Sequence, residues 1–231
     1  KRERIEGTDL VFLRELTGGI YFGEKGRRDG GETAFDNCVY TREEVQRLAK
    51  KGFELAMTRG KRLCCVDKAN VLETSRLWRE TVQAMEKDYP EVSVSYEFVD
   101  AVAMRLVQWP NAYDVLITEN LFGDILTDEA SVISGSMGLM PSASMGAELS
   151  LFEPIHGSYP QATGLNIANP LATVLSAAMM FETAFGLHEE GAAIREVVNK
   201  SLAEGIVTED LADGGKSYGT AEVGDWLVKN I

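Results

Sequence analysis

Short strand patterns alternate with helix patterns through the first 130 residues, and this alternation limits the possible folds more than any other feature. Strands are expected at residues 9–13, 20–22, 63–66, 92–98 and 113–117. Helices are expected between them, at residues 42–60, 73–87 and 102–107, with a further helix at residues 120–129. Alternating strands and helices with short connections are typical of α/β proteins. The sequence therefore predicts an α/β fold.

Two local signals refine this prediction. Thr41 and Glu44 have the spacing of a capping box, which places the start of a helix directly after Thr41. Residues 23–36 are rich in glycine and charge, and we expect them to form a loop.

The chain changes character near residues 134–138. Gly, Ser and Met dominate residues 135–145, and a long segment with His, Gly, Pro and Asn follows at residues 152–170. Helices are expected at residues 171–185, 192–203 and 221–231, the first of them apolar nearly all round and so buried. We expect two domains, residues 1–135 and residues 136–231.

Charge and cysteine content exclude several classes of protein. The net charge of −13 argues against nucleic-acid binding and against attachment to anionic membranes. An anionic substrate stays possible, because a local arginine cluster or a metal ion can invert the field. The longest apolar stretch, residues 171–181, is too short to cross a bilayer. Cys38, Cys64 and Cys65 form no disulfide framework, so we expect a cytoplasmic protein.

Asp124 and Asp128 are the first candidate for chemistry. They lie four residues apart, so a helix would place both carboxylates on one face. Like charges at this spacing repel, and a hard divalent cation such as Mg²⁺ or Mn²⁺ would compensate for the repulsion. A solvated acidic face is the alternative from spacing alone. The apolar neighbours Leu121, Phe122 and Ile125 argue against a simple wet surface.

Four further residues stand at strand or turn ends. Lys68 follows a buried strand and is either a base or the ion-pair partner of Asp67. Asp100 lies between a strand and a helix, where an N-cap is the simpler interpretation. Arg14 can hold a carboxylate and Tyr21 can donate a proton, although a structural role for both weighs more on local evidence.

The segment around His156 contains one of only two histidines, between glycine and prolines that indicate a shaped binding loop. A structural histidine is an equal alternative. The chain contains neither a GxGxxG motif nor a P-loop, and nothing indicates a serine hydrolase or a histidine-rich zinc site.

Taken together, these segments resemble the β-decarboxylating dehydrogenases, the isocitrate/isopropylmalate dehydrogenase family. The motifs occur in family order: residues 14–23 (Arg-Glu-Leu-Thr-Gly-Gly-Ile-Tyr-Phe-Gly), 67–72 (Asp-Lys-Ala-Asn-Val-Leu), 100–104 (Asp-Ala-Val-Ala-Met), 120–126 (Asn-Leu-Phe-Gly-Asp-Ile-Leu), 138–144 (Gly-Leu-Met-Pro-Ser-Ala-Ser), the His156 loop and 166–170 (Asn-Ile-Ala-Asn-Pro). The resemblance implies a two-domain α/β fold with a non-Rossmann cofactor site. Residues 1–135 would be the central dimerisation domain, and residues 136–231 the C-terminal half of the cofactor-binding domain.

The resemblance also implies roles around a metal ion. Asp124 and Asp128 match the carboxylates that bind Mg²⁺ or Mn²⁺, and Asp100 of a second subunit would complete the metal site and contact the substrate. Lys68, also from that second subunit, would help to remove the substrate hydroxyl proton. Tyr21 would help to protonate the enol carbon after CO₂ has left. These roles require a homodimer whose active site is shared between subunits.

Substrate and cofactor positions follow in the same way. Arg14, Asn70 and Val71 match residues that contact a 2-hydroxy dicarboxylate substrate, with Val71 near its side chain. The residues that match the NAD site all lie in the second half of the chain: His156, Gly157, Ser158, Gln161 and Asn169. The sequence Leu-Thr-Gly-Gly at residues 16–19 is similar to that of family members acting on 3-isopropylmalate. This similarity implies NAD-dependent oxidative decarboxylation of that substrate in leucine synthesis.

Two features depart from the family pattern. Gln161 stands where NAD-using relatives usually carry an Asp, but Gln still bonds a ribose diol and offers no charge to a 2′-phosphate, so NAD is expected. The chain is also short and begins at Lys1, which indicates that the N-terminal part of the family fold is missing and that this chain alone has little activity. Another 2-hydroxy-acid dehydrogenase (isocitrate, homoisocitrate or tartrate) and an inactive truncated dimerisation fragment are the alternatives.

Overall fold

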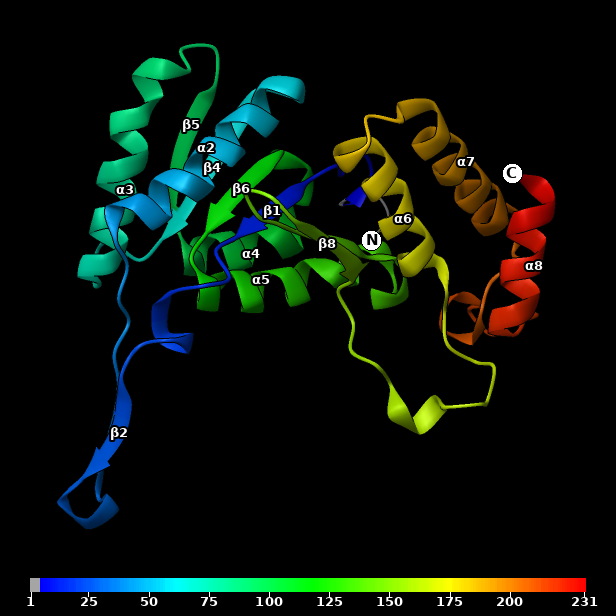
Figure 1. The fold of residues 1–231 in the computed structure, drawn as a ribbon, viewed down its shortest axis with the longest axis horizontal. Helices are drawn as coiled ribbons and strands as arrows, with labels where there is room; N and C mark the ends of the chain where they lie inside the picture. Colours follow the sequence, from blue (N-terminus) through cyan, green and yellow to red (C-terminus); the bar gives the residue numbers. More distant parts are fainter. Residues whose placement is uncertain (1–4) are drawn as a thin grey trace. The chain divides into compact units, whose positions relative to one another are not determined.

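The computed structural model describes residues 5–231. The described residues form two compact units, residues 5–130 and residues 131–231, which are described separately (Figure 1). All three cysteines are free, and burial raises the pKa of the Cys64 thiol to about 12. No helix among residues 5–231 is long and apolar enough to cross a membrane.

The first unit is built on a four-stranded sheet, and the α/β fold class is confirmed. The strands are β1 (Val11–Arg14), β4 (Arg62–Asp67), β5 (Ser93–Phe98) and β6 (Val115–Thr118), in the order β1-β6-β4-β5. All neighbouring strands are parallel. The two central strands, β6 and β4, are buried almost throughout, as expected for a parallel sheet covered on both faces. Because the strands are parallel, their carboxyl ends lie at one edge of the sheet.

Four helices cover this sheet: α2 (Arg42–Thr58), α3 (Glu73–Met85), α4 (Val99–Gln108) and α5 (Asn120–Ser131). Phe53 of α2 and Trp78 of α3 pack in one core with Leu63, Cys65 and Ile117 from the sheet. Helices α4 and α5 lie on the opposite side of the sheet (Figure 1). The predicted capping box is confirmed, because Thr41 Oγ1 accepts the Glu44 N–H and the Glu44 carboxylate accepts the Thr41 N–H.

Two predictions in this unit are wrong. The segment predicted as a strand at residues 20–22 is instead part of a 3₁₀ turn, Gly19–Tyr21, because Gly19 takes a left-handed φ of 72°. The segment predicted as a loop at residues 23–36 is an antiparallel hairpin of β2 (Lys25–Arg28) and β3 (Thr33–Asp36). Two of its glycines, Gly30 and Gly31, form the turn, where both have positive φ values.

The second unit contains a hairpin and three helices. Strands β7 (Pro141–Met145) and β8 (Ser150–Pro154) pair antiparallel, and neither was predicted. Helices α6 (Leu171–Ala184), α7 (His188–Glu204) and α8 (Thr220–Asn230) follow, close to the predicted positions. The core joins Leu171 to Val197, Val198, Val223 and Leu227. Helix α6 was predicted to be buried on all sides, but only four of its residues are buried within this chain.

Candidate functional site at the carboxyl edge of the sheet

The parallel sheet brings the candidate residues of the first unit to one edge. Arg14 is the last residue of β1, and Lys68 directly follows β4. Asp100 lies in the first turn of α4, directly after β5, while Asp124 lies on α5, which follows β6. Ligands of open α/β sheets bind at this edge. Along the edge the residues form two groups, one after β1 and β6 and the other after β4 and β5.

The first group is centred on Asp124. Arg14 Nη1 lies 2.7 Å from Asp124 Oδ1, and the Tyr21 hydroxyl donates to Asp124 Oδ2 at 2.8 Å. The Arg14 guanidinium also lies 5.6 Å from the centre of the Tyr21 ring. A Cβ on Gly123 would lie 2.6 Å from Arg14 Cγ, so glycine at this position lets Arg14 cross α5. Three predicted site residues therefore form one contiguous cluster.

Asp128 extends this group along α5. It follows Asp124 by one helical turn, as the spacing predicted, and it is exposed. Among residues 5–231 no group of three His, Cys, Asp or Glu side chains is close enough to hold a metal ion. Asp100 therefore does not join Asp124 and Asp128 within one chain.

The second group pairs Lys68 with Asp100. Lys68 Nζ donates to Asp100 Oδ1, and this bond holds the pKa of the Asp100 carboxyl below its usual value. Both simpler local interpretations are wrong. Asp67 pairs with Arg79 rather than with Lys68, and Phe98 rather than Asp100 is the N-cap of α4.

Arg79 also supports this group, although no sequence pattern marked it as a candidate. Asp67 is 1% exposed, and its carboxylate accepts from Arg79 Nε at 2.8 Å and from Arg79 Nη2 at 3.0 Å. The same carboxylate accepts the Ala69 N–H at 2.9 Å, while the Lys68 N–H donates to Ser75 Oγ at 3.0 Å. These bonds fix the backbone on both sides of Lys68. A charged residue in a buried strand pattern was the available signal, since such a group needs a partner.

Asn70 and Val71 follow Lys68 in an exposed turn. The Val71 N–H donates to the Lys68 carbonyl at 2.9 Å, and the Val71 side chain is 62% exposed. The structure therefore leaves an apolar side chain in solvent next to the Lys68–Asp100 pair.

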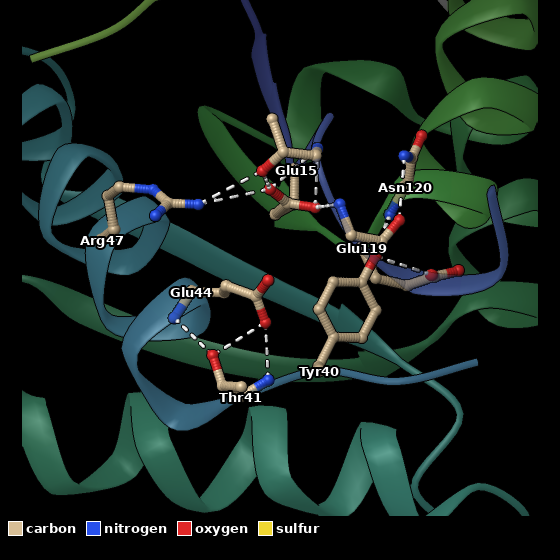
Figure 2. A network of polar contacts seen from close by, with 9 residues as sticks. Glu15, Tyr40, Thr41, Glu44, Arg47, Glu119 and Asn120 are labelled. Atoms are coloured by element: carbon tan, nitrogen blue, oxygen red, sulfur yellow. Dashed lines mark hydrogen bonds and ion pairs between the residues drawn. The ribbon is translucent and has the colours of Figure 1, made fainter. Parts of the chain in front are cut away.

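A buried polar network supports the first group, and Figure 2 shows it. Two buried carboxylates, Glu15 and Glu119, lie on either side of Tyr40 and Asn120. Glu15 accepts the Gly18 N–H at 2.7 Å, and Glu119 accepts the Phe122 N–H at 2.9 Å. Burial raises the pKa of the Tyr40 hydroxyl and of the Glu119 carboxyl. The only sequence signal for Tyr40 was its position just before the capping box, where an apolar residue often packs.

The candidate cofactor residues of the second unit lie between β8 and α6. His156 Nδ1 lies 2.9 Å from the Gly157 carbonyl oxygen, and Ser158 follows in the same exposed loop. Gln161 is exposed in a 3₁₀ turn, Pro160–Ala162. Asn169 closes the segment, because its Oδ1 accepts the Leu171 N–H at 3.0 Å and its Nδ2 donates to Asp210 at 2.9 Å.

Comparison with known proteins agrees with this fold. Residues 1–227 match the family model described as isocitrate/isopropylmalate dehydrogenase. The chain belongs to the isocitrate/isopropylmalate dehydrogenase family, which confirms the resemblance seen in the sequence.

Within that family, the similar relatives include 3-isopropylmalate dehydrogenases. Those of Bacteroides fragilis and Desulfitobacterium hafniense are 56% identical over 232 residues and 52% identical over 229 residues. The matches cover 100% and 99% of this chain but 65% of each relative, so the chain spans about two thirds of their length.

Solved structures of the family have the same fold. Isocitrate dehydrogenase from Methylococcus capsulatus is 36% identical with a TM-score of 0.89, and the match covers 97% of this chain and 70% of that one. A β-decarboxylating dehydrogenase from Thermococcus kodakarensis is 36% identical with a TM-score of 0.85, over 97% of this chain and 65% of that one.

Proposed function

We propose that this chain forms part of the active site of an NAD-dependent enzyme that oxidatively decarboxylates (2R,3S)-3-isopropylmalate to 4-methyl-2-oxopentanoate and CO₂ in leucine biosynthesis. The observation that carries the proposal is the cluster of Arg14, Tyr21 and Asp124 at the carboxyl edge of the sheet. Identity of 50–56% to relatives named 3-isopropylmalate dehydrogenase supports the choice of substrate.

Arg14 and Val71 would hold the substrate. A guanidinium binds a carboxylate through two parallel N–H donors, and Arg14 already bonds one carboxylate, that of Asp124. Val71 offers an exposed apolar surface for the substrate's side chain. Asn70 lies beside it in the same turn.

Asp124 and Asp128 are suited to a divalent cation. Both carboxylates lie on α5 and are accessible to solvent, and Asp124 already accepts from the cationic guanidinium of Arg14. Hard oxygen ligands are those that Mg²⁺ and Mn²⁺ prefer. The third carboxylate would be Asp100 of a second copy, which explains why no such triad forms within the described residues of one chain. When bound, the metal would act as a Lewis acid at the substrate hydroxyl and its adjacent carboxylate.

Two side chains would move protons. Lys68 of the second copy, after losing one proton to solvent, would accept the proton of the substrate hydroxyl at Nζ, and its ion pair with Asp100 would then balance the charge it gains. Tyr21 would give the proton of its hydroxyl to the enol carbon after CO₂ has left. In the structure this hydroxyl is held by Asp124, beside the place proposed for the substrate.

The second unit would bind the nucleotide. The nucleotide, when bound, would supply the hydride acceptor for oxidation at C2 of the substrate. The exposed loop of His156, Gly157 and Ser158 would contact it, together with Asn169. Gln161 is exposed and neutral, so it could bond the ribose hydroxyls without attracting the 2′-phosphate of NADP. The protein would act in the cytoplasm as a homodimer.

A substrate panel on the complete protein, as its natural source makes it, tests this function. With NAD⁺ and Mn²⁺, we expect the highest kcat/KM for 3-isopropylmalate, and a loss of at least about 100-fold in Asp124→Asn and Asp128→Asn. Asp213→Asn is the matched control, because it removes an exposed carboxylate of the second unit. A higher kcat/KM for isocitrate, homoisocitrate or tartrate would contradict the substrate, and full activity of both variants would contradict the metal site.

A further inference from the structure

We propose that Tyr40 is a positioning residue for this site, because its hydroxyl fixes Asn120, and Asn120 holds both Arg14 and the turn before Tyr21. The contacts are properties of the structure, while their importance for catalysis rests on the function proposed above.

The Tyr40 hydroxyl holds the start of α5 through two bonds. It accepts the Asn120 backbone N–H at 3.0 Å and lies 3.3 Å from Glu119 Oε2, to which it donates. The first N–H groups of a helix have no partner within the helix, and Asn120 is only 2% exposed. The hydroxyl therefore provides the partner that water cannot provide.

The Tyr40 ring sets the shape of the turn that leads to Tyr21. A Cβ on Gly18 would lie 2.9 Å from Tyr40 Cε1, and a Cβ on Gly19 would lie 2.3 Å from the Tyr40 hydroxyl oxygen. Both glycines thus pack directly against the ring, and the Gly19 N–H bonds the Val39 carbonyl at 3.1 Å. The turn can approach Tyr40 this closely only because these positions have no side chain.

The Asn120 side chain connects this framework to the predicted substrate residue. Its Oδ1 accepts from Arg14 Nε at 3.1 Å and from Arg14 Nη2 at 2.8 Å. Its Nδ2 donates to the Gly18 carbonyl at 3.2 Å. One amide therefore holds the Arg14 guanidinium and the turn at the same time, and the hydroxyl of Tyr40 anchors the backbone of that residue.

Loss of the hydroxyl should act at Arg14 and Tyr21 rather than on the fold as a whole. Phe at position 40 would keep the ring against Gly18 and Gly19, but it would leave the Asn120 N–H without its acceptor. Displacing reacting groups by about 1 Å can cost about 100-fold in rate. Arg14 and Tyr21 bond the two oxygens of Asp124, so both would be affected together.

NMR of the complete protein, as its natural source makes it, tests this directly, without substrate or metal. In ¹⁵N-arginine-labelled protein, the Arg14 Nε–H signal is identified by its absence in Arg14→Lys. We expect Tyr40→Phe to shift this signal and to accelerate its exchange with water at least about tenfold. The matched control is Tyr113→Phe, since Tyr113 is also buried, at 5% exposed, and its hydroxyl donates at 2.9 Å to Glu97 of β5, the outer strand farthest from β1 and Arg14.

The two variants separate positioning from stability. Tyr113→Phe should lower the unfolding midpoint in urea, as loss of a buried hydroxyl bond does, yet leave the Arg14 signal unchanged. A folded Tyr40→Phe protein with unchanged Arg14 exchange would overturn the proposal, as would an equal effect of Tyr113→Phe on that signal. Failure of the substrate panel would leave this result unaffected, so the two proposals fail separately.

Asn120→Asp gives a second test that does not require a change at position 40. The carboxylate still accepts from Arg14 but cannot donate to the Gly18 carbonyl. We expect the Arg14 Nε–H to stay protected while the backbone amide signals of Gly19 and Tyr21 shift. Unchanged Gly19 and Tyr21 signals, or a loss of Arg14 protection, would contradict the connection through Asn120.

Discussion

At the scale of single residues, the Arg14–Asp124 pair has the clearest consequence. Arg14 Nη1 occupies an oxygen of a proposed metal ligand at 2.7 Å, so a cation must displace it. The side chains are 23% and 46% exposed, and an ion pair in contact with water is worth about 1 kcal/mol or less. The pair therefore lowers the affinity for a metal only modestly when no substrate is present.

We predict that Arg14→Gln strengthens Mn²⁺ binding to the complete, substrate-free protein by about two- to fivefold, which corresponds to that energy. Electron paramagnetic resonance of free Mn²⁺ measures the affinity. Arg62→Gln is the control, because Arg62 bonds the Ala112 carbonyl at the start of β4. Weaker Mn²⁺ binding in Arg14→Gln than in this control would show that Arg14 helps to hold the metal ligand.

Glu119 carries a second prediction at this scale. Burial raises the folded-state pKa of its carboxyl above 4.5, so the folded protein binds this proton more tightly than the unfolded chain does. Protonation of Glu119 therefore contributes to the free energy of unfolding. This contribution is fully present below about pH 4.5 and is lost as the pH rises through the folded-state pKa. Glu119→Gln keeps an acceptor for the Phe122 N–H but carries no charge.

The free energy of unfolding of Glu119→Gln should therefore rise relative to the parent between about pH 4.5 and pH 7. Each unit by which the folded pKa exceeds the unfolded one corresponds to about 1.4 kcal/mol. Urea unfolding at a series of pH values measures the difference. Glu24→Gln, at an exposed position of the same unit, serves as the control. A difference that stays constant or falls with pH would contradict the account.

At the scale of elements, α5 has a glycine, Gly123, in its interior. This glycine allows the Arg14 side chain to pack against the helix, although it does not favour helix formation. Alanine normally stabilises a helix by about 1 kcal/mol relative to glycine. At Gly123 the new Cβ would lie 2.6–3.0 Å from three carbons of Arg14. At Gly224 of α8 it would meet nothing within 4 Å.

Gly224→Ala should therefore stabilise the protein by about 0.5–1 kcal/mol, whereas Gly123→Ala should give no gain or a loss. Thermal and urea unfolding of the two variants measure the effect, with each serving as the control for the other. A comparable gain in both would mean that Arg14 can move aside at no cost.

The same scale shows what the sequence could predict. Elements with a strong apolar pattern were predicted near their true bounds, because burial determines both the pattern and the element: α2 has an apolar stripe on one face, and β4 is a continuous apolar run buried on both faces. The hairpin of β2 and β3 was taken for a loop, since its exposed strands carry no apolar alternation. Pairings such as Lys68 with Asp100 depend on the strand order, which no local pattern contains.

At the scale of the whole molecule, the strand order divides the proposed site into two groups. The Asp124 group lies after β1 and β6, while Lys68 and Asp100 lie after β4 and β5. Family motifs matched Asp124, Asp128 and Asp100 to one metal site, yet they do not form a triad within the described residues of one chain. A two-fold dimer would place the Lys68–Asp100 pair of each copy against the Asp124 cluster of the other copy.

Complementation between two variants tests this shared site most directly. Asp100→Asn and Asp124→Asn are purified separately, and each should lose tight Mn²⁺ binding. After mixing, unfolding and refolding, half of the dimers should be mixed, and each mixed dimer should have one intact site. The account predicts that tight Mn²⁺ sites return at about a quarter of the parent number. No recovery on mixing, or tight binding by Asp100→Asn alone, would contradict it.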